Sequence, residues 1–452
     1  MSGGWNGATD FNDFAVHKHG FIEVLFNFPG AGIPAQRSGG TYDDRGSHCM
    51  RALRDVMQFA MGRQTDSYGY KLDAMLDVQP LYSNAGLCGW SNGGNATITT
   101  AGAWGDSLPG LAWIVNWESP VGDGMPTVDA GRKNCLNPAY NPDTGGFDWS
   151  QLAYCDTLTP SEGYTGGLYF DIDQDGRYDS NTSDFKVPVY VYKNKLYYSV
   201  QMRDAAQAKG ISCSPETAAP GLTESFWLWR NGENWIQSAV QANPDLMFIV
   251  EAGDQDHVQG APDHPHILVQ TNGFLAAGGR FVRLNPDRSY VREITGGPVP
   301  SASDNDAFVV YDRVSIRNAL QPRADVSMLS GVTAALCEIA DRTFYNDVRP
   351  NLTDLTTVNS TPSRPDQFYL EPNYPNPFNS RTTIRFSLAA ASEVELTVYD
   401  IQGRMVTILK REYLAAGSHS VVWNAESLAS GMYLLKLRAG TNYRLEKMSL
   451  VK

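Results

Sequence analysis

A serine flanked by glycines is the strongest candidate for chemistry in this chain. Residues 89–93 are Gly-Trp-Ser-Asn-Gly, and they follow a short apolar segment, residues 85–88, that predicts a strand. Residues 95–101 suit a helix. A serine on a sharp strand-to-helix turn is raised above the sheet, and small neighbours leave room for the backbone. Ser91 is therefore predicted to be a nucleophile in acyl transfer, with helix amides behind it favouring negative charge.

Acyl transfer also needs two backbone N–H groups directed at the developing oxyanion. Asn92 would supply the first. The second is expected after residues 21–28, an apolar run that predicts a strand buried on both faces and ends in Pro29-Gly-Ala-Gly. Phe28 or Ala31 would be this donor, because Pro29 has no N–H. A simple Gly/Pro turn is the alternative.

A carboxylate and a histidine are expected near residue 256. Gly253-Asp-Gln-Asp-His-Val follows a predicted strand, residues 246–250, and Asp256 is the expected acid, with Asp254 as the fallback. Such a carboxylate would orient a histidine and stabilise its protonated form. The candidate bases in the same loop are His257, His264 and His266, with His48 more distant. The two later loop histidines are favoured, because His257 directly adjoins Asp256.

Strands and helices alternate along the first 350 residues, which predicts an α/β fold with a parallel sheet. The expected strands are 21–28, 85–88, 111–117, 246–250 and 280–284, and the expected helices are 49–61, 226–240, 264–277 and 328–342. With GxSxG and the segment GxxDxV at 253–258, which is similar to the family's GxxDxxV pattern, this order resembles the α/β-hydrolases, in particular esterases, lipases and polyester hydrolases. The resemblance implies a Ser-His-Asp mechanism on a small or polymeric carboxylic ester, without an organic cofactor.

Two features depart from that family. Its histidine normally follows the strand predicted here at 280–284, but this chain continues Asn-Pro-Asp-Arg-Ser-Tyr, with Tyr290 near the expected place. Only about twenty residues precede the oxyanion segment, so an N-terminal truncation is expected, which would also explain the lack of a signal peptide. A prolyl-oligopeptidase-like serine peptidase and an inactive surface binding protein on a hydrolase scaffold remain open.

A second candidate site lies in a loop-rich insertion at about 119–225. Asp171-Ile-Asp-Gln-Asp-Gly places alternating carboxylates beside a glycine that permits a sharp turn, which is typical of calcium loops. A structural calcium ion is predicted on Asp171, Asp173, Asp175 and Asp179. Thr182 occupies the twelfth position instead of Glu, so the loop is no EF-hand, and Asp184 is a further candidate ligand. A solvated Asp-Gly turn is the alternative.

Composition narrows the class of protein. Of 452 residues, 42% are hydrophobic and 19% charged, as in folded globular proteins. The net charge of −13 and the lack of a basic cluster argue against nucleic acid as a partner. No apolar run reaches the ~20 residues of a membrane helix. The six cysteines show no CxxC spacing, and either a Cys135–Cys155 bridge or free thiols would fit.

The last part of the chain predicts a separate all-β domain. Residues 351–366 lack periodicity and suggest a linker between a hydrolase domain, residues 1–350, and residues 367–452, where strand patterns alternate with turns. Its ordered blocks are 374–379 (YPNPFN), 398–403 (VYDIQG) and 431–437 (GMYLLKL). They resemble the type A sorting domain of the type IX secretion system, an Ig-like sandwich. The resemblance implies passage across the outer membrane by the type IX machinery, with release or surface attachment. A generic Ig-like accessory module is the alternative.

Overall fold

The computed structural model divides the chain into two compact units, Met1–Thr353 and Asp354–Lys452. Its described residues are 19–32, 37–122, 126–132, 135–181, 183–255, 260–286, 310–320, 328–345, 368–370, 373, 376–388, 391–400, 402, 404–414, 417–440 and 442–452. The division falls within the predicted linker 351–366, whose residues lie outside these ranges. Each unit is described by itself.

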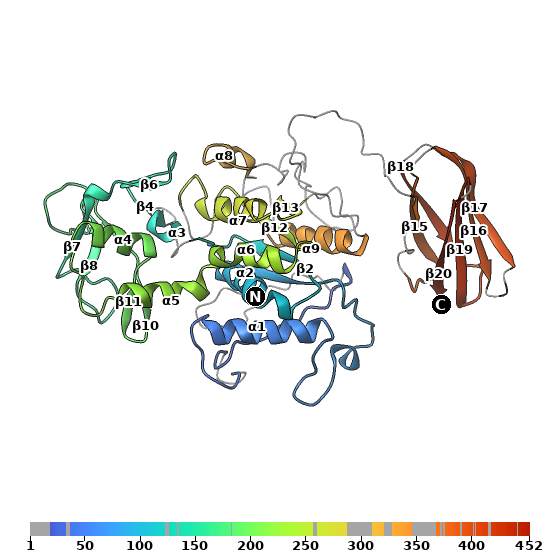
Figure 1. Cartoon of the computed structure of the whole chain (residues 1–452), viewed down its shortest axis with the longest axis horizontal. Coiled ribbons are helices and arrows are strands. Elements are labelled where there is room, and N and C mark those ends of the chain that lie inside the picture. The colour runs from blue at the N-terminus through green and yellow to red at the C-terminus, as the bar shows by residue number, and fades with distance from the viewer. Residues whose placement is uncertain are drawn as a thin grey trace. The chain divides into compact units, whose positions relative to one another are not determined.

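A four-stranded parallel sheet forms the centre of the first unit (Figure 1). Its order is β1 (Ala85–Trp90), β2 (Leu111–Trp117), β12 (Met247–Glu251) and β13 (Phe281–Leu284). All three neighbouring pairs are parallel. The predicted parallel sheet is therefore confirmed, and four of its five predicted strands lie within two residues of their expected bounds.

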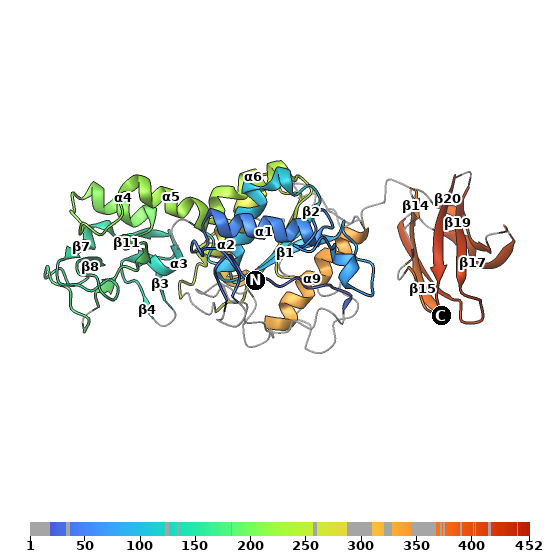
Figure 2. The same cartoon turned by 90° about the horizontal axis from the view of Figure 1, so that it is seen from below.

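Helices cover both faces of this sheet, which explains why its strands are continuous apolar runs. One face packs against α1 (Ser47–Ala60), α2 (Asn92–Ala103), α6 (Ile236–Ala242) and α7 (Pro265–Ala276), and the other against α9 (Met328–Tyr345). Figure 2 shows α9 apart from α1 and α2. Within β12, Phe248 and Val250 join the first core, whereas Met247 and Ile249 join the second. The strand thus alternates between two apolar layers.

The prediction of a strand at residues 21–28 is wrong, because this segment has no regular secondary structure. Its apolar residues are nevertheless used in packing. Phe21 packs against the core beneath α9, while Phe28 belongs to the core on the opposite face. Phe26 meets Phe28 edge to face, with ring centroids 5.2 Å apart. Hydrophobicity here reports burial, which a short apolar run can achieve without strand pairing.

The helix predicted at 226–240 is broken in the structure. Helix α5 (Pro220–Arg230) ends before Asn231, and a 3₁₀ turn, Gly232–Trp235, leads into α6. Asn231 has extended backbone, and its side chain accepts a hydrogen bond from the amide of Glu233 at 3.0 Å. An asparagine that caps the next turn competes with helix continuation, so the apolar pattern alone missed the break.

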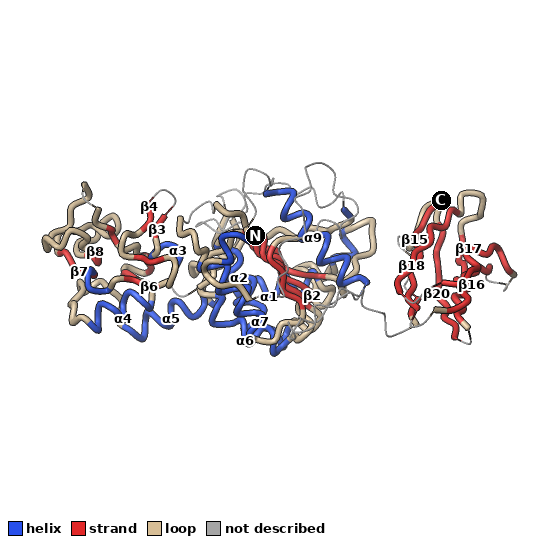
Figure 3. Tube along the Cα trace, turned by 90° about the horizontal axis from the view of Figure 1, so that it is seen from above, coloured by secondary structure: helices blue, strands red, loops and turns tan. Residues whose placement is uncertain are grey.

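The predicted insertion forms a lobe of short strands beside the sheet (Figure 3). Its main elements are β5 (Tyr140–Asn141), β7 (Leu152–Cys155), β8 (Gly167–Phe170), β9 (Phe185–Lys186), β10 (Tyr190–Tyr192), β11 (Lys195–Tyr197) and α4 (Val200–Ala208). Strands β7, β8 and β9 make an antiparallel sheet. Cys135 and Cys155 are free thiols, so the disulfide considered from the sequence is not formed.

The C-terminal unit consists of two antiparallel sheets, as its alternating pattern predicts. One contains β14 (Tyr369–Leu370), β15 (Arg381–Leu388) and β18 (Gly417–Asn424), and the other β17 (Met405–Leu414), β16 (Ser392–Asp400), β19 (Gly431–Ala439) and β20 (Asn442–Leu450). Both sheets contribute to one core, with Phe386 from the first and Leu396 and Leu435 from the second. The segments predicted as strands, 382–386, 394–399, 417–423 and 431–438, do not include β14, β17 or β20. Strand β17 lies at a sheet edge and carries charged residues such as Lys410 and Arg411, which obscure its pattern.

No helix in the described ranges has the length and apolar character needed for a membrane span. Helix α9 instead carries a buried ion pair. The guanidinium Nε of Arg342 lies 2.8 Å from Glu338 Oε1, and both side chains are almost fully buried. Arg283 of β13 approaches the other carboxylate oxygen at 3.6 Å. This cluster joins α9 to the sheet.

Replacing Arg342 by Met is expected to lower the free energy of unfolding of the first unit by about 3–5 kcal/mol, because Glu338 would keep a buried charge after losing its closest cation. Urea unfolding followed by tryptophan fluorescence measures this. Arg280 pairs with Asp245 at the surface, so Arg280→Met should cost less than ~1 kcal/mol. Glu338→Leu combined with Arg342→Met should recover only part of the loss, because Arg283 then lacks the Glu338 carboxylate. Equal losses for the two arginine variants would contradict this account.

Candidate active site

Ser91 occupies a strained turn between β1 and α2. Its backbone has φ 49° and ψ −128°, a conformation that non-glycine residues rarely adopt. The amide of Ser91 still donates to the carbonyl of Trp117 in β2 at 2.9 Å, so the sheet holds the turn. Helix α2 begins at the next residue, Asn92. The first amides of a helix have no partner within it, which directs N–H groups and a positive dipole toward the region of Ser91.

Packing explains the glycines of this turn. A Cβ on Gly89 would lie 2.7 Å from backbone atoms of Gly93 and Gly94. A Cβ on Gly94 would lie 2.0 Å from Oγ of Ser119, which is fully buried. Any side chain at these two positions would therefore push α2 away from β1 or from the segment after β2. Gly89 and Gly94 are therefore steric requirements of this turn.

Strained residues also follow two other strands of the sheet. Glu118 comes directly after β2 with φ 40°, and Asn285 directly after β13 with φ 61°. Both continue the sheet by backbone hydrogen bonds: Glu118 donates to the carbonyl of Glu251 at 2.9 Å, and Asn285 to that of Val250 at 2.7 Å. Strain of this kind concentrates at functional sites, and ligands of open parallel sheets bind outside the carboxyl ends of the strands.

Glu118 is a candidate functional residue that the sequence interpretation missed. Because Trp90 pairs with Trp117, Glu118 follows β2 at the level at which Ser91 follows β1. Only 1% of the residue is exposed. Carboxylates are seldom buried without a specific role or partner. A polar residue directly after the apolar run 111–117 was the available signal.

Two of the candidate histidines lie at the start of α7. His264 precedes the helix with φ 41° and is buried, and its Nε2 lies 3.0 Å from the backbone carbonyl oxygen of Asp254. His266 is buried in the first turn. Its carbonyl accepts from Gln270 Nε2 at 3.1 Å, and the same nitrogen donates to the carbonyl of Ser119 at 3.0 Å. The start of α7 is thereby joined to the segment that packs against Gly94.

The other predicted members of the site are outside the described residues. They are Asp256 and His257, together with Tyr290, which was noted in place of the histidine of the hydrolase family. Asp254 is described, and its contact with His264 is made by the backbone carbonyl.

A buried polar network fixes the elements beneath Ser91. Thr97 of α2 donates through Oγ1 to Asn116 Oδ1 at 2.8 Å, and Asn116 Nδ2 donates to Gln270 Oε1 at 3.2 Å. All three side chains are fully buried. A satisfied buried network favours one arrangement of its elements, here of α2, β2 and α7.

A second network attaches the insertion to the histidine-bearing turn. Asp263, which precedes His264, is fully buried, and its Oδ2 accepts from the hydroxyl of Tyr140 in β5 at 2.5 Å. Arg313 forms an ion pair with the same carboxylate and donates to Tyr140 Oη at 3.0 Å. Burial, followed by the negative charge of Asp263, raises the pKa of Tyr140 above its usual range. The phenol therefore stays protonated as a donor.

The segment predicted to supply the second oxyanion donor is a compact turn. The amide of Ala31 donates to the carbonyl of Phe28 at 2.9 Å, so this turn already uses it. Gly30 has φ 73°, and a Cβ there would lie 2.6 Å from the amide nitrogen of Tyr42. The glycine is thus required by a close backbone approach. Phe28 is therefore the remaining candidate of the two predicted donors.

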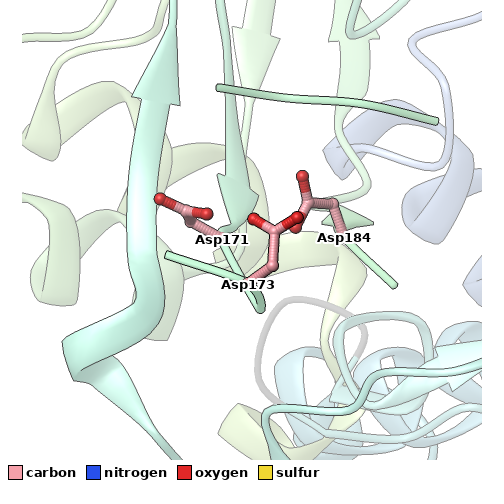
Figure 4. Close-up of side chains that lie close together, drawn as sticks. All are labelled: Asp171, Asp173 and Asp184. Carbon is pink, nitrogen blue, oxygen red and sulfur yellow. The ribbon is translucent and has the colours of Figure 1, made fainter. Parts of the chain in front are cut away.

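The acidic loop brings together a different set of residues from the predicted one. Oxygens of Asp171, Asp173 and Asp184 lie within 4.8 Å of one another (Figure 4). Asp175 and Asp179 do not belong to this group. Their Oδ1 atoms accept local backbone hydrogen bonds at 2.8 Å, from Arg177 and Asn181 respectively. The group therefore contains two of the four predicted ligands, Asp171 and Asp173, together with Asp184, which was a further candidate from the sequence.

Comparison with known families decides the nature of the C-terminal unit. Residues 373–451 match the secretion system C-terminal sorting domain. This unit is a type IX secretion sorting domain. The protein is therefore exported through the type IX system, to the cell surface or the surroundings. Of the sequence blocks that predicted the domain, Tyr374, Pro375, Ile401 and Gly403 lie outside the described residues.

Comparison with curated proteins gave no match. Among solved structures, one similar chain is PorZ, described as an essential bacterial surface component of the type-IX secretion system of Porphyromonas gingivalis, with 20% identity and a TM-score of 0.14 over 21% of this chain and 13% of that chain. Another is the endo-β-1,4-mannanase of Thermotoga petrophila, with 10% identity and a TM-score of 0.15 over 50% of this chain and 51% of that chain. The matched region covers 13% of PorZ and 51% of the mannanase. Because both TM-scores are so low, neither similarity is evidence for the fold or the activity of this chain.

Replacing Gly89 by Ala is expected to destabilise the first unit by about 1–3 kcal/mol or more, because the new methyl group would meet backbone atoms that cannot move aside. A Cβ added to Gly221, in α5, would meet no described atom within 4 Å. Gly221→Ala should therefore be neutral or stabilising by up to ~1 kcal/mol. Chemical denaturation compares the two variants. Equal stability of the two variants would show that the turn can accommodate a methyl group at residue 89.

Proposed function

We propose that the first unit is a serine hydrolase of the α/β-hydrolase type that cleaves carboxylic esters. The backbone of Ser91 carries the proposal. A serine with φ 49° between a buried parallel strand and a helix presents its hydroxyl at the carboxyl edge of the sheet. Burial alone gives no reason for a non-glycine residue in this conformation. The glycines and the buried network beneath it support a turn held in one geometry.

In this mechanism the hydroxyl of Ser91 attacks the ester carbonyl while a histidine accepts its proton. The amide of Asn92, at the start of α2, and a second amide, from Phe28, stabilise the tetrahedral oxyanion. The protonated histidine then gives its proton to the leaving alcohol, and an acyl-enzyme remains on Ser91. Water, activated by the same histidine, releases the acid and restores the serine.

Two carboxylates compete for the role of orienting the histidine. Asp256 is the candidate from the sequence pattern, and Glu118 is the candidate favoured by its place beside Ser91 and its burial. The base is one of His257, His264 and His266. The link from His266 through Gln270 to Ser119 supports the α7 histidines, since it ties their turn to the segment behind the nucleophile.

Two other functions remain as outcomes of the test. A serine peptidase of the prolyl-oligopeptidase type would use the same nucleophile on amides after proline. A surface binding protein on a hydrolase scaffold would have no turnover, and the lack of a histidine directly after β13 favours it over a fully conventional triad. Export to the cell exterior is compatible with all three functions.

Ser91→Ala is expected to reduce hydrolysis of short p-nitrophenyl esters by at least roughly 10³-fold, because the attacking oxygen is lost. Release of p-nitrophenol is the measurement, with aminoacyl-proline anilides as the competing substrates. Ser107→Ala is the control. Ser107 lies beyond the C-terminal end of α2, and this helix, about 18 Å long, separates it from Ser91. Preferential anilide cleavage would replace the esterase by a peptidase. A folded wild type without turnover on either substrate would contradict hydrolysis.

Single Asn substitutions of His257, His264 and His266 are expected to separate the base from its neighbours. The base variant should lose about 10³-fold or more in kcat, with KM nearly unchanged, because it acts in the chemical step. Glu118→Gln and Asp256→Asn are compared in the same way, and the larger loss in kcat identifies the carboxylate that orients the histidine. His419→Asn, in β18 of the sorting domain, is the control. Full activity in all three histidine variants would rule out this set as the base.

A further inference from the structure

The loop between β8 and β9 closes on itself through Asp184. Asp171 directly follows β8, and Asp184 directly precedes β9, so both lie where the two strands end. Phe170 and Phe185, their neighbours, pair across these strands. Asp184 Oδ1 accepts from the amide of Ile172 at 2.9 Å. The sheet itself thus brings two carboxylates together, and the intervening loop adds Asp173.

Asp171 is the buried member of this group. Only 8% of the residue is exposed. Its Oδ2 accepts from the amide of Gly176 at 3.0 Å, whereas its Oδ1 is buried and has no hydrogen-bond donor among the described residues. A buried carboxylate oxygen without a donor is costly. Figure 4 shows one oxygen of the Asp171 carboxylate toward Asp173, so a cation between the two side chains would lie beside this buried carboxylate.

The negative charges of the three carboxylates also favour binding of a cation. Oxygens of the three carboxylates lie within 4.8 Å of one another, so up to three negative charges share one small volume. Like charges at this separation repel one another. A divalent cation would remove the repulsion and supply the electrostatic partner that Asp171 Oδ1 needs.

We propose that Asp171, Asp173 and Asp184 bind one calcium ion that holds the β8–β9 end of the insertion together. Oxygen-only ligands select a hard cation. Ligands from a loop and from two strand ends form an irregular set, which suits the variable coordination of Ca²⁺ better than the strict octahedron of Mg²⁺. Backbone carbonyls or water would complete the shell. The site lies in the lobe, so its role is structural and does not depend on the proposed hydrolase.

Two tyrosines provide a direct probe. Tyr169 and Tyr178 lie with ring centroids 5.5 Å apart. Tyr169 belongs to β8 and precedes Asp171 by two residues, so this phenol lies close to the acidic group along the chain. Tb³⁺ bound in a calcium site emits when a nearby tyrosine is excited. Full-length protein should therefore show tyrosine-sensitised Tb³⁺ emission that Ca²⁺ displaces and Mg²⁺ displaces at least roughly tenfold less well.

Asp171→Asn and Asp184→Asn should each weaken Tb³⁺ and Ca²⁺ binding by about tenfold or more, because each removes a charged ligand. Asp175→Asn is the matched control, since Asn Oδ1 can still accept from the amide of Arg177, and its affinity should stay within about threefold of the wild type. Titration calorimetry with Ca²⁺ gives both affinities.

Wild-type protein alone also tests the site. Its melting temperature should rise by roughly 5 °C in Ca²⁺ at a hundredfold excess over Kd, relative to EDTA. This readout remains if the Asp171 variant fails to fold. The proposal is overturned if wild-type protein binds neither ion, or if Asp175→Asn weakens binding as much as Asp171→Asn does.

Discussion

The candidate active site depends on one backbone conformation, the positive φ of Ser91. That conformation costs free energy of order 1–3 kcal/mol in an L-residue and persists only where its surroundings determine it. Here they do so from three sides: Trp117 accepts the serine's amide, Gly94 lies against Ser119, and Gly89 lies against the start of α2. The sheet, the glycines and the helix therefore stabilise a single turn, and the proposed chemistry needs this turn to be rigid.

The same edge of the sheet shows how a scaffold can accumulate polar and strained residues where a reaction would occur. Glu118 and Asn285 continue the strands by backbone hydrogen bonds in conformations that glycine would adopt more easily. The buried network from Thr97 to Gln270 lies beneath them and resists rearrangement. The histidine-bearing turn is anchored from the insertion, through Tyr140 and Asp263. The lobe thus contributes to the geometry of the site as well as to its surroundings.

Sequence reasoning was most successful where burial and local sterics agree. The strands β1, β2, β12 and β13 are apolar on both faces, and Gly89 and Gly94 of GxSxGG lie where contacts under 3 Å exclude side chains. It failed where burial occurs without strand pairing, at residues 21–28, and where a local cap interrupts a helix, at Asn231. Glu118 and the Asp184 ligand were missed or left secondary because tertiary pairing places them, β2 beside β1 and β9 beside β8. The spacing of residues along the sequence does not show which strands pair with one another.

The most direct measurement of the central claim is covalent labelling of the full-length protein with a fluorophosphonate, followed by peptide mass spectrometry. The account predicts one stoichiometric adduct on the peptide that contains Ser91, formed by the folded protein and lost on prior denaturation. An adduct on another serine would move the active site. A folded protein that forms no adduct under conditions in which a known serine hydrolase is labelled would contradict an activated hydroxyl at this turn.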